Sequence, residues 1–289
     1  MRRYTASPTI QTQNYTYLKP MKIVKGELSL GRFLVPYRIY GEAKKTIICI
    51  SGAKQTMAAW RTFVSHFVKE YSVVVFDLPG QGRATILSGA PSITFEEQIN
   101  VLHSIVNETN RNGTVILAAA SWGTIISAAL AARHPELIDK MILGSFGAKP
   151  SKAVIEIIRA GQKLFDTNKT DDIAPLMIEK FGQHIPATQK KQMIDQFRGM
   201  NREQFLSFYE HCEFVEQASD IGDFVDLGNI TASTLVLSGE YDAILDPSDI
   251  EKASARIPDC EFKMIPGAGH FLHWERADIL NTYSEFLAR

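Results

Sequence analysis

The sequence predicts an α/β fold in which a mostly parallel sheet of about eight strands is flanked by helices. Two observations support this prediction. Short apolar runs alternate along the chain with segments of helical spacing, which is typical of parallel strands joined by crossover helices. One interval, about residues 150–228, lacks any strand pattern and holds amphipathic helical segments, such as the one with Val154, Ile157, Ile158 and Leu164.

Length and composition limit the classes of protein that fit this chain. Its 289 residues include 45% hydrophobic side chains, enough for the core of one large domain. The 31 basic and 32 acidic side chains nearly cancel, which argues against a nucleic-acid-binding surface. The three cysteines, Cys49, Cys212 and Cys260, lie far apart and follow no disulfide or zinc spacing. Because no HExxH pair is present either, we expect no metal and no other cofactor.

The N-terminal segment, residues 1–20, is expected to be an extended or loosely held arm. It is polar and lacks the apolar stretch of a secretory signal. The longest apolar stretches, such as residues 125–132, fall short of the ~20 residues that span a bilayer. We therefore expect a soluble, cytoplasmic protein.

Periodicity predicts the individual strands and helices. Strands are expected at residues 46–50, 72–77, 114–119, 140–145, 234–238 and 261–265, and the one at 72–77 is expected to be buried. Helices are expected at residues 60–70, near 94–108, at 122–133 and at roughly 277–288. An antiparallel N-terminal hairpin is expected from residues 27–34 and 36–40.

The helical interval 150–228 predicts a cap on a core made of residues 1–149 and 229–289. It interrupts the alternation of strands and helices between two strands of the predicted parallel sheet. Ligands bind at the C-terminal ends of the strands in open α/β sheets. We therefore expect the cap to cover that edge.

Residues 119–123, Ala-Ala-Ser-Trp-Gly, lie where one predicted strand ends and a helix begins. In this setting a sharp turn lifts a serine hydroxyl off the backbone, and crowding requires small residues on both sides, here Ala119 and Gly123. The turn also places the Ser121 hydroxyl at a helix N-terminus, whose dipole stabilises negative charge. The sequence therefore predicts a nucleophilic serine, and an ordinary helix-capping serine is the alternative.

A serine nucleophile requires a base, and His270 is the predicted one. It lies in the glycine-rich loop 267–271 after the last strand, where small neighbours let the loop reach across the sheet edge. His273 is the rival, but it begins a helical stretch. The remaining histidines lie in helical patterns or in the cap and are interpreted as surface or packing residues: His66, His103, His134, His184 and His211.

Asp242 is the predicted carboxylate that orients His270. It follows strand 234–238, whereas the loop after the preceding strand, residues 145–148, carries no carboxylate. Asp246 and Glu240 remain alternatives. The chain order serine, aspartate, histidine is the one expected for a serine on a strand-to-helix elbow.

Two backbone N–H groups, those of Trp122 and Ala53, are expected to stabilise the negative charge of a reacting carbonyl. Gly52 permits the tight turn that presents Ala53, although a plain loop glycine is the alternative. Residues 76–82 lack the lysine and spacing of a phosphate loop, so we interpret them as a structural turn and Asp77 as structural.

These motifs, in this order, resemble the α/β-hydrolase superfamily from about residue 27 to the C-terminus. The motifs that carry the resemblance are Ser51-Gly52-Ala53, Asp77-Leu78-Pro79-Gly80, the elbow 119–123, Gly239-x-x-Asp242 and Gly269-His270-Phe271. Ala119 replaces the usual first glycine of the elbow, and Ser51 replaces the usual histidine. The resemblance implies the α/β-hydrolase fold and serine chemistry.

Within the superfamily the chain resembles the 3-hydroxyacyl-ACP acyltransferases of rhamnolipid and polyhydroxyalkanoate precursor synthesis. The matching segments are Ala120–Gly123, Ser51–Ala53, Gly269–Leu272 and, in the cap, Gly182–Pro186. The chain departs from this subfamily in two places: it has the ordinary hydrolase turn at residues 80–82 and an Ala-Ile pair after Asp242. A tryptophan after the serine is also less specific, because it occurs in proline iminopeptidases as well. The resemblance implies acyl carrier protein as a partner.

The combined prediction is a serine hydrolase that cleaves a carboxylic ester or acyl thioester through an acyl-serine intermediate. An apolar acyl pocket is expected under the cap, although these residues also suit simple packing of the cap on the core. The expected substrate-binding residues are Gly52, Phe146, Ile157, Phe181, Phe208 and Phe271.

Two alternatives stay open. The first is an acyltransferase that uses hydroxyacyl-ACP or CoA thioesters, with Lys191, Arg198 and Arg202 on one helical face toward the acidic carrier protein, unless that face is merely solvated. The second is a non-catalytic ligand-binding scaffold. Dehalogenase and epoxide chemistries are disfavoured because they need an aspartate where this chain has Ser121, whereas lyase or perhydrolase chemistry stays open.

Overall fold

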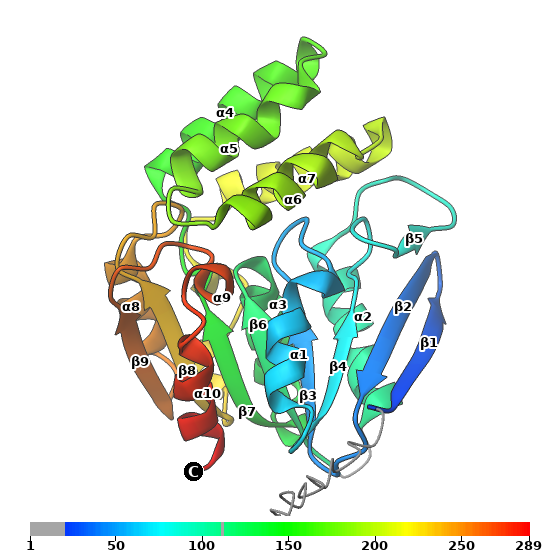
Figure 1. Ribbon diagram of the computed structural model, residues 1–289, viewed down its shortest axis with the longest axis vertical. Helices are drawn as coiled ribbons and strands as arrows, with labels where there is room; N and C mark the ends of the chain where they lie inside the picture. Colours follow the sequence, from blue (N-terminus) through cyan, green and yellow to red (C-terminus); the bar gives the residue numbers. More distant parts are fainter. Residues whose placement is uncertain (1–20, 111–112) are drawn as a thin grey trace, which may run out of the picture.

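A computed structural model describes residues 21–110 and 113–289, so the predicted N-terminal arm lies outside the described residues. One sheet organises the chain (Figure 1). Its strands are β1 (Ile23–Leu30), β2 (Phe33–Tyr40), β3 (Thr46–Ile50), β4 (Ser72–Phe76), β5 (Thr85–Ile86), β6 (Val115–Ala120), β7 (Ile138–Gly144), β8 (Ser233–Gly239) and β9 (Cys260–Ile265). Their order across the sheet is β1-β2-β4-β3-β6-β7-β8-β9, and β5 pairs with β2.

The strands from β4 to β9 along this order are parallel, while β1, β2 and β5 pair antiparallel. All five residues of β3 and of β4 are buried, which explains their unbroken apolar sequence. Helices cover both faces of the sheet (Figure 1). The predicted fold class, a mostly parallel sheet flanked by helices, is confirmed.

The helices that surround the sheet are α1 (Arg61–Phe67), α2 (Phe95–Thr109), α3 (Trp122–Arg133), α8 (Pro247–Ser254), α9 (Leu272–Glu275) and α10 (Ile279–Leu287). Successive residues of β3 point to opposite faces. Ile47 and Cys49 pack in a cluster with α1 and α10, whereas Ile48 and Ile50 pack in a cluster with α2, α3 and α8. Helices α1, α2, α3 and α10 and strands β3, β4, β6, β7, β8 and β9 follow the sequence prediction closely, whereas β5, α8 and α9 were not predicted.

The N-terminal hairpin is antiparallel as predicted, but the predicted position of its turn was wrong. The turn lies at Gly31 and Arg32 rather than at Val35. Gly31 has a φ of 58°, a left-handed conformation that glycine adopts without a Cβ clash. The alternating burial of β2 then continues through Pro36, which pairs with Glu27 of β1.

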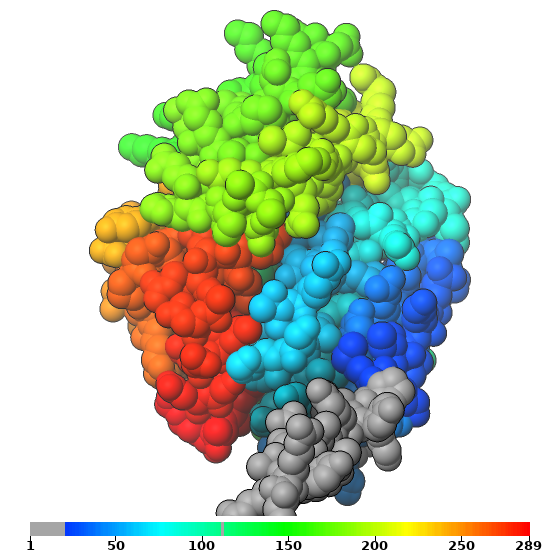
Figure 2. Space-filling model, viewed as in Figure 1, coloured from blue at the N-terminus to red at the C-terminus, as the bar shows by residue number. Residues whose placement is uncertain are grey.

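Four helices between β7 and β8 form a layer over the C-terminal ends of the parallel strands (Figures 1 and 2). They are α4 (Lys152–Asp166), α5 (Ile173–Phe181), α6 (Ala187–Arg198) and α7 (Arg202–Gln217), and we call them the helical layer. Buried aromatic residues such as Phe165, Phe197 and Phe205 give the layer a core of its own. The chain after α7 differs, because Ile221 and Val225 pack into the main core below.

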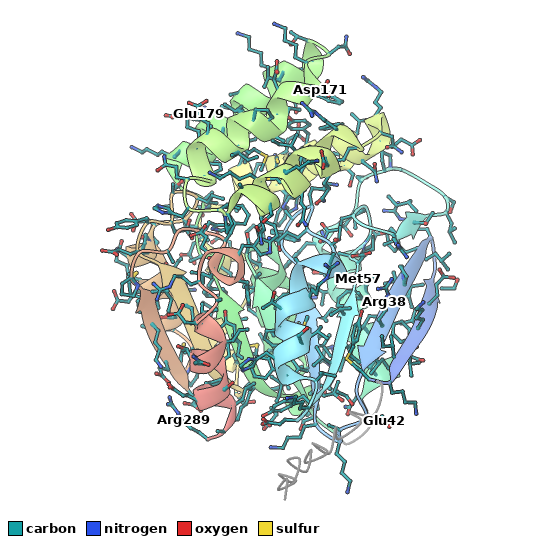
Figure 3. All side chains as sticks on the ribbon, viewed as in Figure 1. Arg38, Glu42, Met57, Asp171, Glu179 and Arg289 are labelled. Carbon is teal, nitrogen blue, oxygen red and sulfur yellow. The ribbon has the colours of Figure 1, made fainter. Side chains whose placement is uncertain are left out.

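Many charged side chains lie on the outside of the molecule. Asp171 and Glu179 project from the helical layer, while Glu42 and Arg289 lie toward the opposite end (Figure 3). None of the helices in the described part of the chain is long and apolar enough to cross a membrane.

Candidate active site

Ser121 occupies the sharp turn between β6 and α3. Its backbone has φ 50° and ψ −122°, a conformation that a residue with a side chain rarely adopts. The turn is held because the Ser121 N–H donates to the Gly144 carbonyl at 2.9 Å. A Cβ atom on Gly123 would lie 2.5 Å from the Ile50 carbonyl oxygen, so the crowding predicted for this position is present. Strain of this kind persists where the surroundings over-determine a functional conformation.

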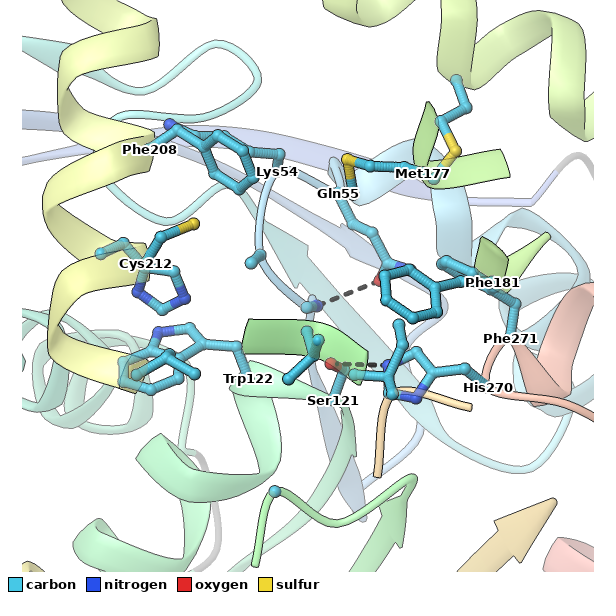
Figure 4. A pocket seen from close by; sticks show the side chains of 18 of the residues that line it. Lys54, Gln55, Ser121, Trp122, Met177, Phe181, Phe208, Cys212, His270 and Phe271 are labelled. Carbon is cyan, nitrogen blue, oxygen red and sulfur yellow. Dashed lines mark hydrogen bonds between the residues drawn. The ribbon is translucent and has the colours of Figure 1, made fainter. Parts of the chain in front are cut away.

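The structure brings together the three side chains that the sequence predicted as a catalytic triad. Ser121 Oγ lies 2.9 Å from His270 Nε2 (Figure 4), and His270 Nδ1 lies 2.8 Å from Asp242 Oδ2. Asp242 Oδ1 accepts the N–H groups of Ile244 and Leu245 at 2.9 and 3.0 Å. Because His270 and Asp242 are only 6% and 7% exposed, solvent hardly competes for this chain of hydrogen bonds.

The loop that carries His270 is fixed from two sides. The Ser145 hydroxyl donates to the His270 carbonyl at 2.8 Å. The Glu275 carboxylate accepts the N–H groups of Gly269 and Phe271, the latter at 3.1 Å. These contacts hold the imidazole in one orientation, as a base of defined tautomer requires.

The alternative acid and base residues have other partners. Asp246 caps α8 by accepting the Ser248 N–H at 2.8 Å. Glu240 accepts the Gly267 N–H at 2.9 Å. His273 is half-buried beside Trp60, with ring centroids 5.0 Å apart, and desolvation lowers its pKa to about 4. The described contacts therefore join neither carboxylate to His270, nor His273 to Ser121.

The loop after β3 lies against Ser121. A Cβ atom on Gly52 would be 3.1 Å from the Ser121 Cβ. The Gly52 N–H donates to Gln55 Oε1 at 3.0 Å (Figure 4), whereas the Ala53 N–H has no acceptor within the described chain. The Trp122 N–H opens α3 and therefore has no partner within its own helix. Both predicted donors are thus available beside the serine.

A cavity of about 570 Å³ lies between the helical layer and the strand ends. Ser121 and His270 line it, and its size falls in the range of small-molecule sites. Its walls are largely apolar. Five of the six predicted substrate-binding residues line it, namely Gly52, Ile157, Phe181, Phe208 and Phe271.

The prediction that Phe146 lines this cavity was wrong. Its side chain is completely buried in the main core. Ser145, directly before it, has a φ of 53°, and the turn leaves Gly147 and Ala148 at the cavity wall instead.

The predicted basic face of Lys191, Arg198 and Arg202 is also wrong, because these residues do not share a helix. α6 ends at Arg198, and Arg202 begins α7 after the cap residue Asn201. Lys191 pairs with Asp195 at 2.6 Å, and the Arg202 guanidinium lies over the Phe165 ring at 5.2 Å.

Asp77 has a structural role, the cysteines are free, and the described residues form no metal site. Asp77 accepts the N–H groups of Met57 and Arg83 at 2.7 and 2.9 Å, as a structural turn residue would. Across residues 21–110 and 113–289, no group of three His, Cys, Asp or Glu side chains is arranged to hold a metal ion. Cys49, Cys212 and Cys260 carry free thiols.

The cavity-lining residues that the sequence reasoning missed include Lys54, Gln55 and His211. Lys54 and Gln55 directly follow the predicted Gly52-Ala53 turn, so their proximity to the site was available from the sequence. His211 gave no such signal, because α7 is amphipathic along its length and only its packing shows which face meets the cavity. The other four histidines interpreted as surface or packing residues do not line it: His66, His103, His134 and His184.

The fold and the turn at Ser121 are those of an α/β-hydrolase, and comparison with known proteins agrees. Residues 45–277 match the model of the alpha/beta hydrolase fold family, so the chain belongs to this family. Among relatives, the (R)-3-hydroxydecanoyl-ACP:CoA transacylase of Pseudomonas aeruginosa is 22% identical over 249 residues, covering 85% of this chain and 82% of the relative. The predicted resemblance to such acyltransferases is therefore present as distant similarity.

Two further proteins illustrate the range of the family. The 2-hydroxy-6-oxononadienedioate/2-hydroxy-6-oxononatrienedioate hydrolase 2 of Pseudomonas putida is 23% identical over 288 residues, covering 90% of this chain and 92% of the relative. The solved structure of MGS-M2, an alpha/beta hydrolase enzyme from a deep-sea metagenome library, superposes with a TM-score of 0.78 at 19% identity. It covers 91% of this chain and 98% of MGS-M2.

Proposed function

We propose that this α/β-hydrolase family enzyme cleaves a carboxylic ester or an acyl thioester through an acyl intermediate on Ser121. One observation carries the proposal: the hydrogen-bonded chain from Ser121 through His270 to Asp242 opens into an apolar cavity. A serine hydroxyl becomes nucleophilic when a base takes its proton, and an apolar cavity suits an acyl chain.

The proposed reaction has two halves. Ser121 Oγ attacks the carbonyl carbon while His270 accepts its proton, and Asp242 stabilises the resulting imidazolium. The N–H groups of Ala53 and Trp122 stabilise the oxyanion. His270 then protonates the leaving alcohol or thiol. In the second half a water molecule gives a proton to His270 as its oxygen attacks the acyl carbon. The bond from that carbon to Ser121 Oγ then breaks, His270 returns the proton to Oγ, and the acid is released.

We further propose that residues 150–228 act as a cap domain on a core of residues 1–149 and 229–289. The supporting observation is the position of the helical layer above the strand ends, where Phe181 and Phe208 contribute to the cavity wall. In this arrangement the cap sets the acyl chain length.

Labelling with a fluorophosphonate tests the nucleophile. We expect the modified peptide to contain Ser121, and we expect Ser121→Ala to abolish both labelling and multiple-turnover cleavage of p-nitrophenyl esters. Ser65→Ala changes an exposed serine of α1 and is the matched control, with wild-type labelling expected. Zero rates for every ester would contradict the hydrolase proposal. Equal rates at every chain length would contradict the proposed acyl pocket.

Acyl transfer is the second candidate, and the similarity to the transacylase of Pseudomonas aeruginosa favours it. In this case a CoA thiol or a second hydroxyacyl group replaces water, and acyl carrier protein delivers the substrate. Incubation with hydroxyacyl-ACP and CoA, followed by mass spectrometry, separates the two. Free acid supports hydrolysis, and acyl-CoA or a dimeric ester supports transfer. A non-catalytic scaffold is excluded by turnover that Ser121→Ala removes.

A further inference from the structure

Lys54 places a cation in the wall of this largely apolar cavity. Its side chain reaches from the loop after β3 toward Phe208 of α7, away from Ser121 (Figure 4). The ammonium group donates to the Gly80 carbonyl at 2.9 Å and lies 5.8 Å from the centre of the Phe208 ring. An ammonium group has three donors. Two of them have no acceptor among the residues that the structure describes.

No carboxylate in the described chain neutralises this charge. The cavity-lining residues include neither Asp nor Glu, and Lys54 makes no ion pair with any described residue. The other two cations of the lining, Arg61 and Lys149, are exposed to solvent. A cation held among apolar groups without a counter-ion is costly, so such a charge is kept where a ligand completes it.

The backbone of Lys54 strengthens this inference. Its φ is 56°, in the left-handed region where glycine would be accommodated more easily. The conformation is held because Gln81 Oε1 accepts the Lys54 N–H at 2.8 Å and the Gln196 side chain donates to the Lys54 carbonyl. The chain therefore has a lysine at a backbone conformation that favours glycine, and the lysine side chain lines the cavity.

His211 adds a second donor beside Lys54. Phe208, His211 and Cys212 lie three and four residues apart on α7, and all three line the cavity. The imidazole packs edge-on against Trp122, with ring centroids 4.1 Å apart, and makes no hydrogen bond to the described residues. Burial and the nearby Lys54 charge lower the pKa of His211 to about 3. The ring is therefore neutral and keeps one N–H to donate.

We propose that Lys54 and His211 form a carboxylate-binding subsite at the part of the cavity remote from Ser121. The preferred acyl group then carries a second, distal carboxylate, whose oxygens accept the two remaining ammonium N–H groups and the imidazole N–H. This inference rests on the proposed function, because it assigns the acyl chain of that reaction to the cavity.

Matched ester pairs test the subsite. Mono-p-nitrophenyl esters of dicarboxylic acids are compared with p-nitrophenyl esters of monocarboxylic acids of equal length. At the best length, we expect wild-type kcat/KM to favour the dicarboxylate by about tenfold or more, and Lys54→Met to reduce that ratio to near one. Lys54→Arg retains the charge and should retain part of the preference. Lys191→Met, in the exposed Lys191–Asp195 ion pair, is the control and should leave the ratio unchanged.

Binding measurements separate this proposal from the proposed function. Ser121→Ala and Ser121→Ala/Lys54→Met are titrated by calorimetry with the monomethyl ester of a dicarboxylic acid and with the corresponding fatty-acid methyl ester. Selective binding that depends on Lys54 supports the subsite even if no ester is turned over. Turnover of neutral esters without any preference for the dicarboxylate overturns the subsite and leaves the hydrolase proposal standing. Lys54→Gln replaces Lys54→Met if circular dichroism shows that the latter is unfolded.

Discussion

Hydrogen bonds hold both carboxylate oxygens of Asp242 in place. Its carboxylate is buried and accepts three N–H groups, from Ile244, Leu245 and His270. We expect Asp242→Asn to lower kcat on the best p-nitrophenyl ester by roughly 10³–10⁴, because the imidazolium loses its anionic partner and the histidine its tautomer. Asp246→Asn, which alters only the cap of α8, is the control. A variant Asp242→Asn within tenfold of the wild type would contradict the assigned role.

Lys54 gives the site a pH dependence with a defined sign. Burial lowers its pKa to about 8, so its charge is present below that pH and is lost above it. Its titratable neighbours from α7 do not change charge near this pH, because burial lowers the pKa of His211 to about 3 and raises that of Cys212 to about 12. We therefore expect the preference for dicarboxylate esters to fall as pH rises through about 8.

The measurement is the ratio of kcat/KM for the two members of a matched ester pair. Because the same catalytic residues act on both substrates, effects of pH on those residues change the two values of kcat/KM equally and leave the ratio unchanged. In Lys54→Met the ratio should be near one and independent of pH. A wild-type ratio that stays constant from about pH 6 to pH 9 would argue against Lys54 as the anion-binding group.

At the scale of elements, Arg32 and Glu97 tie the N-terminal hairpin to α2. The Arg32 Nε atom lies 2.8 Å from Glu97 Oε1, and Glu97 also completes the capping box with Thr94. The hydrogen bond from Arg32 is the main reason that the pKa of Glu97 falls to about 2 from 4.5. The stabilisation is therefore fully present above pH 4.5 and is lost as pH falls through about 2.

We expect Glu97→Gln to lower the free energy of unfolding at neutral pH by about 1 kcal/mol, a value reduced for the partial exposure of the pair. Urea unfolding at neutral pH and near pH 2 measures it. The difference from wild type should shrink at the lower pH, because the wild-type carboxylate is then partly protonated. Glu251→Gln, on the exposed side of α8, should have no effect at either pH.

The helical layer contains a buried hydroxyl without a partner. The Tyr209 OH group makes no hydrogen bond to the described residues, and burial raises the pKa of Tyr209 well above its ordinary value. Removing an unsatisfied buried polar group relieves a desolvation cost. We expect Tyr209→Phe to leave the free energy of unfolding unchanged or to raise it. Tyr37→Phe is the contrast, since the Tyr37 hydroxyl donates to Glu108 at 3.0 Å and its loss should cost ~1 kcal/mol.

At the scale of the whole molecule, the sheet and the helical layer have separate cores. Two large clusters fill the two faces of the sheet, while a smaller aromatic cluster holds the helical layer together. Local opening is easier where fewer apolar contacts are lost. We expect hydrogen exchange measured by mass spectrometry to be slowest in β3, β6 and β7 and faster in α4 and α5. Equal protection of the two regions would mean that they open as one unit.

The positions of most strands and of the proposed triad followed from local sequence. Apolar runs fix where buried strands lie, and Ser121, Asp242 and His270 each follow one of them, at the ends of β6, β8 and β9. Parallel strands bring their C-terminal ends to one edge, so residues far apart in the chain were expected to meet there. Small residues around Ser121 and His270 marked the two turns that bring them into contact.

Only the tertiary structure decided which side chains face the cavity. Phe146 and Phe181 have similar local sequence character, yet one is in the core and the other in the cavity wall, because packing between layers orients them. Tertiary structure also decides that the charge of Lys54 has no counter-ion, because none of the described cavity-lining residues is a carboxylate. Periodicity and turn sterics act over a few residues and can be read along the chain. The orientation of a side chain and the neutralisation of its charge depend instead on residues that are distant in the sequence and that the fold brings close.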